Sequence, residues 1–146
     1  MPDAGVAELT RVDWWIYDTL YADAQIQLAV GERIYVDQAS QFATEPMIVF
    51  QMLGASDKAL TSRRRLSTAL YLVRAIRKGS TYSALETLAD RIEAVLQVPD
   101  TGTIVREVNI TSCNREQGFK RMDDQNGVPY VHLGGIYRVR FQSAFQ

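Results

Sequence analysis

Residues Tyr71 to Leu96 read YLVRAIRKGSTYSALETLADRIEAVL and contain the clearest helix pattern of the chain, with an apolar segment directly before it. The second half of this stretch has apolar residues at the spacing of one helical face and charged residues on the other, as in an amphipathic helix. Ser83 and Glu86 have the spacing of a capping box, in which each side chain accepts a hydrogen bond from a free backbone amide. Pro99 ends this helix, because the residue before a proline leaves helical geometry. The helix is therefore predicted to lay one face on a sheet.

The first half of the same stretch, Leu70 to Lys78, is apolar on both of its alternating faces. It fits a strand covered on both sides, and it also fits a helix beginning near Leu66. We predict a strand, since the capping box beyond it implies a new start for the following helix. Met47 to Leu53, which follows Pro46, is another apolar run of strand length and is predicted as a central strand.

Further elements follow from local patterns. Thr10 to Ala22 is predicted as an amphipathic helix, and Ile104 to Cys113 alternates as a strand with one wet face. Asn126-Gly127 supplies the positive φ angles of a hairpin turn, and Gly134-Gly135 is predicted as a bulge in the last strand. The fold class is thus α+β: a mixed or antiparallel sheet, one long amphipathic helix packed on it and an N-terminal helix.

Length and composition indicate one domain over residues 1–146, large enough to bury a core without a disulfide. Residues 1–9 are predicted to be a flexible arm, and residues 54–67 a projecting loop. No apolar run approaches the length of a membrane span, and neither a signal peptide nor membrane association is expected. The single Cys113 is expected to be a buried structural thiol.

Charge is unevenly placed along the chain, although the net charge is only -1. Residues 1–57 carry nine acids and two arginines, whereas the remainder is basic. The basic part lacks interleaved aromatic residues, so sequence-specific nucleic-acid binding is not expected. Two interpretations stay open: a polar molecule that docks head to tail, or a coincidence that the fold cancels.

No motif for catalysis, metal or cofactor binding is found. His132 is the single histidine, and no nucleophile motif flanks it or Cys113. Asp123-Asp124 lies in a predicted turn without further metal ligands at fixed spacing. Gly134-Gly135 lacks the lysine and the following helix of a phosphate loop. A binding or structural role is therefore favoured over an enzyme, and no cofactor is expected.

Two groups of residues are candidates for contacts between proteins. Trp14 and Trp15 are adjacent on a helix, so both cannot face one core; one is either partly exposed or an intersubunit anchor. Arg63, Arg64 and Arg65 are expected on an exposed loop, where they are either solvated or bound to an acidic surface.

The chain resembles the tail terminator, or tail completion, proteins of long-tailed bacteriophages and gene transfer particles. The resemblance covers most of the chain and rests on patterns of fold. It is carried by the N-terminal helix followed by Asp23, Ile26 and VGERIY at 30–35, Pro46 before its strand, AIRKGSTY at 75–82, ADRI at 89–92, the residues from Cys113 to Glu116, and the closing strand from His132 to Phe141.

The resemblance implies a structural virion protein that forms a hexameric ring, terminates the tail tube and joins it to the head connector. It implies the tail tube protein and a neck or connector protein as partners, DNA passing through the ring, and assembly in the host cytoplasm. Two alternatives stay open. One is a neck or head completion ring protein, and the other is a small soluble enzyme or ligand-binding domain with a pocket near His132.

Overall fold

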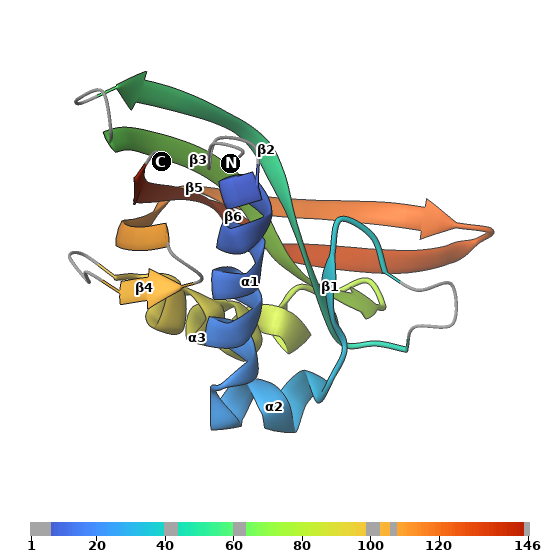
Figure 1. Ribbon diagram of the computed structural model, residues 1–146. Coiled ribbons are helices and arrows are strands. Elements are labelled where there is room, and N and C mark those ends of the chain that lie inside the picture. The colour runs from blue at the N-terminus through green and yellow to red at the C-terminus, as the bar shows by residue number, and fades with distance from the viewer. Residues whose placement is uncertain (1–6, 40–43, 60–63, 99–102, 106–107, 145–146) are drawn as a thin grey trace.

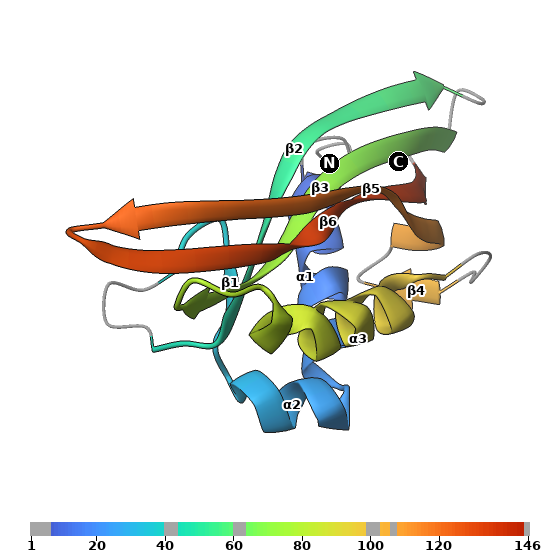
Figure 2. The same cartoon turned by 180° about the vertical axis from the view of Figure 1, so that it is seen from behind.

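The computed structural model describes residues 7–39, 44–59, 64–98, 103–105 and 108–144. Its described part is one six-stranded sheet in the order β1-β2-β3-β6-β5-β4, with α-helices gathered on one face (Figures 1 and 2). Only β1 and β2 pair in parallel, so the sheet is mixed and the predicted α+β class is confirmed. The elements are α1 (Ala7–Tyr21), α2 (Ala24–Val30), β1 (Ile34–Val36), β2 (Met47–Ala59), β3 (Arg64–Lys78), the 3-10 turn η1 (Ser83–Leu85), α3 (Glu86–Leu96), β4 (Thr103–Val105), β5 (Val108–Gln125) and β6 (Val128–Ala144).

The core lies between the sheet and the helices. Alternate residues of each strand point to this side, and the aromatic rings of Phe50, Tyr71, Tyr137 and Phe141 are almost fully buried there. A smaller cluster of Met47, Val49 and Ile76 is buried on the opposite face. Strand β2 is therefore covered on both sides, as predicted, although it lies second in the sheet rather than at its centre.

Helix α1 packs on the core through a stripe of apolar residues spaced three and four apart. Val12, Trp15, Ile16 and Leu20 are all buried. The helix begins at Ala7 rather than Thr10, so the predicted flexible arm over residues 1–9 is corrected for residues 7–9, which are helical. The rest of that arm lies outside the described residues.

The prediction that Leu70 to Lys78 is a strand is confirmed, because β3 includes this segment. Helix α3 follows as predicted and buries Leu88, Ile92 and Leu96. The capping box is wrong: a 3-10 turn precedes α3, and neither element has a side-chain cap hydrogen bond. Leu85 joins the 3-10 turn to α3, and its side chain is fully buried. Apolar packing of this residue, rather than a side-chain hydrogen bond, therefore anchors the start of the helix.

The predicted loop over residues 54–67 is corrected for residues 54–59 and 64–67, which belong to β2 and β3, while residues 60–63 lie outside the described residues. We name these paired strand ends the β2–β3 arm. These strands pair from Met47 to Ala59, with an irregularity between Met52 and Gly54. Inside the arm, the Ser67 hydroxyl donates to Asp57 Oδ1 at 2.6 Å. Polar residues in this segment mimic a loop because the arm is largely exposed, whereas the ladder of β3 on β6 keeps it extended.

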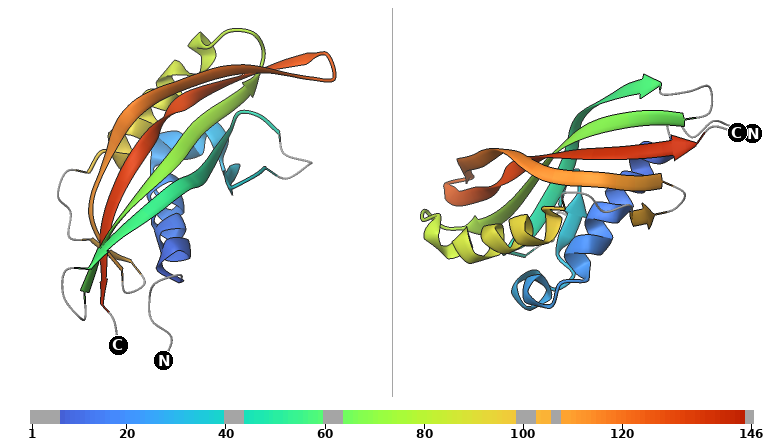
Figure 3. Two further views of the ribbon diagram at one scale, coloured as in Figure 1. Left: turned by 90° about the horizontal axis from the view of Figure 1, so that it is seen from above. Right: turned by 90° about the vertical axis from the view of Figure 1, so that its left-hand side faces the viewer.

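A second hairpin arm, made by β5 and β6, extends to the opposite end of the sheet (Figure 3). Asn126 and Gly127 have φ angles of 55° and 83° at its turn, which confirms the predicted hairpin. The predicted strand from Ile104 to Cys113 is two strands instead. Val105 pairs with Val108 in an antiparallel ladder, so the chain reverses between β4 and β5.

Gly134 and Gly135 do not form the predicted bulge. Both pair regularly with β3, and the irregularities lie in β5, between Ile110 and Ser112 and between Arg115 and Gln117. A Cβ atom on Gly134 would lie 2.0 Å from the carbonyl oxygen of Val73. Glycine is therefore required because the backbones of β3 and β6 approach closely, not because the strand kinks.

Candidate protein interface

A groove of about 410 Å³ lies along the outer side of α1. Thr10, Asp13, Trp14 and Tyr17 line it from the helix, and Val36 at the end of β1 lines it from the other side. We name these five residues the α1 groove. Most of its exposed lining is apolar, and an open apolar groove on a small protein is typical of a site where another molecule docks.

An aromatic row continues the groove along α1. The rings of Trp14 and Tyr17 meet edge to face at 6.0 Å, and those of Tyr17 and Tyr21 stack at 5.7 Å. Trp14 is 47% exposed and Tyr21 41%. Large aromatic side chains that are held rigid by one another and remain exposed are common at the centre of protein interfaces.

The floor of the groove is acidic. Asp13 Oδ1 accepts a 2.5 Å hydrogen bond from the hydroxyl of Tyr71, which is fully buried in the core. Burial raises the pKa of Asp13, while the bond from Tyr71 opposes this and the charge of Asp37 adds to it. Burial, and then the same hydrogen bond, raise the pKa of Tyr71. Strand β3 thus fixes the position of the carboxyl that lines the groove.

The helical layer around the groove is acidic overall. Residues 7–33 and 83–96, which include all three α-helices, carry eight carboxylates and three arginines. Partial burial raises the pKa of Tyr17, and the charges of Tyr21, Glu32 and Asp18 add to this effect. Five of the nine acids counted in residues 1–57 therefore lie in residues 7–33, which include α1 and α2 on the helix side of the sheet.

The opposite face of the sheet is basic. Along β3, β5 and β6, the residues that alternate with core residues form this face. Glu116 and Asp123 are its acids in the described strands, and each pairs with an arginine, Arg138 and Arg121 respectively. We name the five basic residues of this face whose side chains the structure describes the basic face: Arg74, Lys78, Arg121, Arg138 and Arg140.

His132 lies on the same side of the sheet as the basic face and lines neither described cavity, although the next two residues, Leu133 and Gly134, border the second cavity. It is 95% buried, with Nε2 3.1 Å from Asp123 Oδ2 but no well-aligned hydrogen bond to either ring nitrogen. Burial and then the charge of Arg74 lower its pKa, so the ring is neutral near pH 7. The alternative function as an enzyme or ligand-binding domain placed a pocket near His132, but His132 lines neither described cavity. Trp14 borders one of these cavities and Glu86 borders the other.

Cys113 and His132 cannot form one catalytic site. Cys113 belongs to the core on the helix side and pairs with Val139, whereas His132 points to the other face. Val139 lies seven positions after His132 in β6, a distance of roughly 23 Å at the usual rise per residue. Burial raises the pKa of Cys113 to about 12, so its thiol is inert.

The structure separates the residues singled out as contacts. Trp15 is buried in the core, so it is corrected from an interface candidate to a packing residue, and Trp14 is the exposed member of the pair. Arg64 and Arg65 lie in β3, paired with Ala144 and Ser143 of β6, rather than on a loop. Arg63 lies outside the described residues. Of the residues in the α1 groove, only Trp14 was singled out from the sequence, because Val36 reaches the groove only when the chain folds.

A second cavity of about 220 Å³ is polar and lies between α3, β5 and β6. Glu86, Asp90 and Arg115 border it, and Arg115 forms a 2.8 Å ion pair with Glu93.

Within the described ranges, no three His, Cys, Asp or Glu side chains are placed to share a metal ion. In that same part of the chain, no helix is both long and apolar enough to cross a membrane.

Comparisons with known proteins identify a matching family and a solved chain of the same fold. The family model described as "Tail completion protein gp17" matches residues 15–133. A solved chain from the virion of a native gene transfer agent particle superposes with a TM-score of 0.71. It is 14% identical, and the match covers 94% of this chain and 99% of that chain, so it shows a shared fold. No curated protein sequence matches this chain significantly.

The family match defines a structural tail protein of the bacteriophage and gene transfer agent class. The family model spans most of the chain, from the middle of α1 into β6. The chain belongs to the tail completion protein gp17 family.

Proposed function

We propose that this protein forms a ring, with six subunits, that terminates the tail tube and joins it to the head connector. Membership of the tail completion family is the observation that carries the proposal. The exposed aromatic row on α1 and the two hairpin arms at opposite ends of the sheet support it, since a ring subunit needs contacts on several sides (Figure 3). Residues 1–146 act in it as one domain.

The partners in this proposal are further copies of the chain, the tail tube protein and a neck or connector protein. DNA passes through the ring without base-specific contacts, and assembly takes place in the host cytoplasm before the subunit becomes part of the virion. The decisive experiment images particles made without this protein. Overlong tails support a terminator, whereas tails of normal length that lack heads assign the protein to the neck instead.

We also propose that Arg63, Arg64 and Arg65 contact another tail or neck protein. Arg64 and Arg65 belong to the β2–β3 arm, at the same end of the molecule as the start of α1 (Figure 3). Adjacent guanidinium groups repel one another, and a sixfold ring repeats them into a collar of positive charge. Each exposed pair contributes only about 0 to 1 kcal/mol, but six copies act together.

The test changes all three arginines to serine. Ring formation and tail joining are then measured separately at low and at moderate salt. Normal rings with salt-sensitive loss of joining support the proposal. If rings and joining match the parent protein under both conditions, the arginines are only solvated.

A further inference from the structure

Two surfaces of this subunit differ in both charge and chemistry. The α1 groove is aromatic, and the helical layer on its side of the sheet carries eight carboxylates against three arginines, with Asp23 and Glu93 already paired to Arg91 and Arg115. The basic face on the other side of the sheet has five cations, and its two carboxylates are each already paired with an arginine. The α1 groove of one subunit therefore complements the basic face of another subunit, whereas neither surface complements a second copy of itself.

We propose that the α1 groove of one subunit docks on the basic face of a second copy of this chain. This inference rests on the proposed ring and names the surfaces that close it. A contact between two unlike surfaces is heterologous, so each subunit uses one surface on each neighbour, and a fixed rotation per contact closes a ring. A self-complementary contact between like surfaces would instead stop at a dimer.

Charge complementarity favours the basic face of a second copy, rather than a second α1 groove, as the surface that docks on the α1 groove. Docking α1 against another copy of α1 would bring Asp18 and Glu32 of one subunit toward the same residues of the next, and like charges at an interface are costly. The basic face offers Arg140, which is exposed, whereas Arg138 near it on β6 is already paired with Glu116. A guanidinium that enters the groove finds the Trp14 ring for a cation–π contact and the Asp13 carboxyl for an ion pair.

Burial of the aromatic row supplies the apolar part of the contact. Trp14, Tyr21 and Val36 are each more than one third exposed in the isolated subunit. Rigid aromatic side chains lose little conformational entropy on binding, so a groove that is already formed by Asp13, Tyr71 and the stacked rings is well suited to dock without rearrangement.

The test uses one variant on each surface. Trp14→Ser disables the α1 groove, and Arg140→Glu disables the basic face. Met122→Ser is the control for the first, since Met122 is exposed to a similar degree on the other arm. Arg77→Glu is the control for the second, since it makes the same charge change on a residue paired with Val131, a core position on the helix side.

Subunit association is measured by mass in native buffer and by sedimentation. The parent protein and both controls are expected to form the same oligomer, and each surface variant alone to associate at least tenfold more weakly. Mixing the two variants is expected to give a one-to-one pair, because the Trp14→Ser subunit still has a basic face and the Arg140→Glu subunit still has a groove. If Trp14→Ser lowers the unfolding midpoint, Val36→Lys on the opposite wall replaces it.

The outcomes separate this inference from the proposed function. If folded variants give no pair on mixing, or if both associate like the parent protein, other surfaces join the subunits and the inference is wrong while a ring still stands. Variants that associate normally but no longer attach to tails show that another tail protein covers the groove, which also overturns it. A parent protein that stays monomeric also overturns the inference. The proposed function is tested separately, by the images of tails made without this protein.

Discussion

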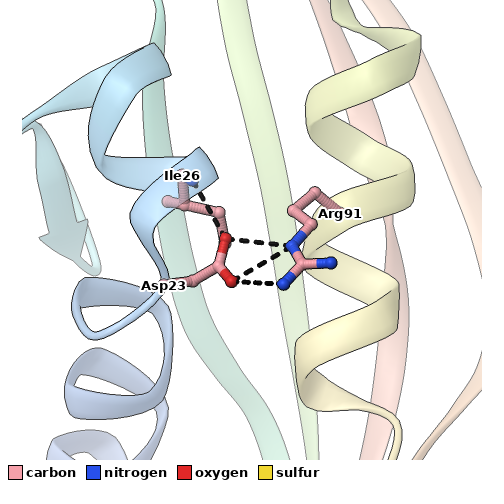
Figure 4. A network of polar contacts seen from close by, with 3 residues as sticks. All are labelled: Asp23, Ile26 and Arg91. Carbon is pink, nitrogen blue, oxygen red and sulfur yellow. Dashed lines mark hydrogen bonds and ion pairs between the residues drawn. The ribbon is translucent and has the colours of Figure 1, made fainter.

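Arg91 of α3 holds Asp23, which precedes α2, in a bidentate ion pair (Figure 4). The Nε atom lies 3.1 and 3.0 Å from the two carboxylate oxygens, and Nη2 lies 2.5 Å from Oδ1. Asp23 Oδ2 also accepts a 3.0 Å hydrogen bond from the amide of Ile26. One carboxylate thus caps α2 and ties the two helices together, which lowers its pKa.

Asp23→Ala is expected to lower the free energy of unfolding by about 1 kcal/mol from the lost cap alone, and further from the lost pair. Arg91→Lys is expected to lower the urea midpoint as well, since a lysine cannot reproduce the planar fork. Urea unfolding of both variants and of the double variant gives the coupling between the two residues. Arg115→Lys, which alters the exposed pair with Glu93, serves as the control and should leave the midpoint unchanged.

Acid should weaken the contribution of Asp23. Because the Arg91 pair lowers its pKa in the folded state, the carboxylate stabilises the protein above the unfolded-chain pKa of about 3.9, and this stabilisation is lost as pH falls through the folded-state pKa. The stability difference between the parent protein and Asp23→Asn is therefore expected to be largest near neutral pH and to shrink below pH about 4. Urea unfolding at a series of pH values measures it, and a difference that does not change with pH contradicts this account.

The opposite sign is expected for Asp13, whose pKa is raised by burial. Its contribution is greatest below the unfolded-chain pKa and is lost as pH rises through the folded-state pKa. The same series on Asp13→Asn therefore provides a matched comparison. A stability difference that changes with pH in the same direction for both variants would show that one of the two environments is misassigned.

Gly134→Ala should destabilise the protein by about 3 kcal/mol, because the added Cβ would lie 2.0 Å from a backbone oxygen of Val73 that cannot easily move. Gly118→Ala is the control. Nothing lies within 4 Å of a Cβ at that position, so a change within about 0.5 kcal/mol is expected. Thermal and urea unfolding test both, and an equal effect of the two substitutions would disprove the close approach of β3 and β6.

Tyr71→Phe should cost about 1 to 3 kcal/mol, because it leaves the partly buried Asp13 carboxyl without its hydrogen-bond donor. Tyr21→Phe, which removes a hydroxyl from the exposed row on α1, is expected to change the unfolding free energy by less than about 0.5 kcal/mol. Urea unfolding compares them. Equal losses would mean that the bond between β3 and α1 does not hold the groove in place.

Cys113 should react with a thiol reagent slowly in the native protein and rapidly in urea. It is 1% exposed, and burial raises its pKa to about 12, so little thiolate is present at neutral pH. Alkylation followed by mass measurement gives the rate. His132→Ala should leave that rate unchanged unless the protein unfolds, and a native rate that depends on His132 would revive a joint site.

Much of the fold could be predicted because periodicity reports directly on burial. The stripe of Val12, Trp15, Ile16 and Leu20 and the two-sided apolar run of β3 both lie where their patterns indicate. The arm at residues 54–67 was missed because its exposed strands carry polar residues typical of loops. Its extended shape depends on pairing with β6, which is more than sixty residues away in the chain.

Local sequence patterns were enough to predict the α+β class, the positions of α3 and β3, the hairpin at Asn126-Gly127 and the resemblance to a tail protein family. These depend on local spacing and local backbone preference, which need no distant partner. Folding alone brings Val36 to Trp14 in a groove, makes Gly134 serve a close strand contact, and sets the acid-rich helical layer on the side of the sheet opposite the basic face. Each of these depends on which strands pair and which side of the sheet the helices cover, and sequence spacing carries no direct record of either.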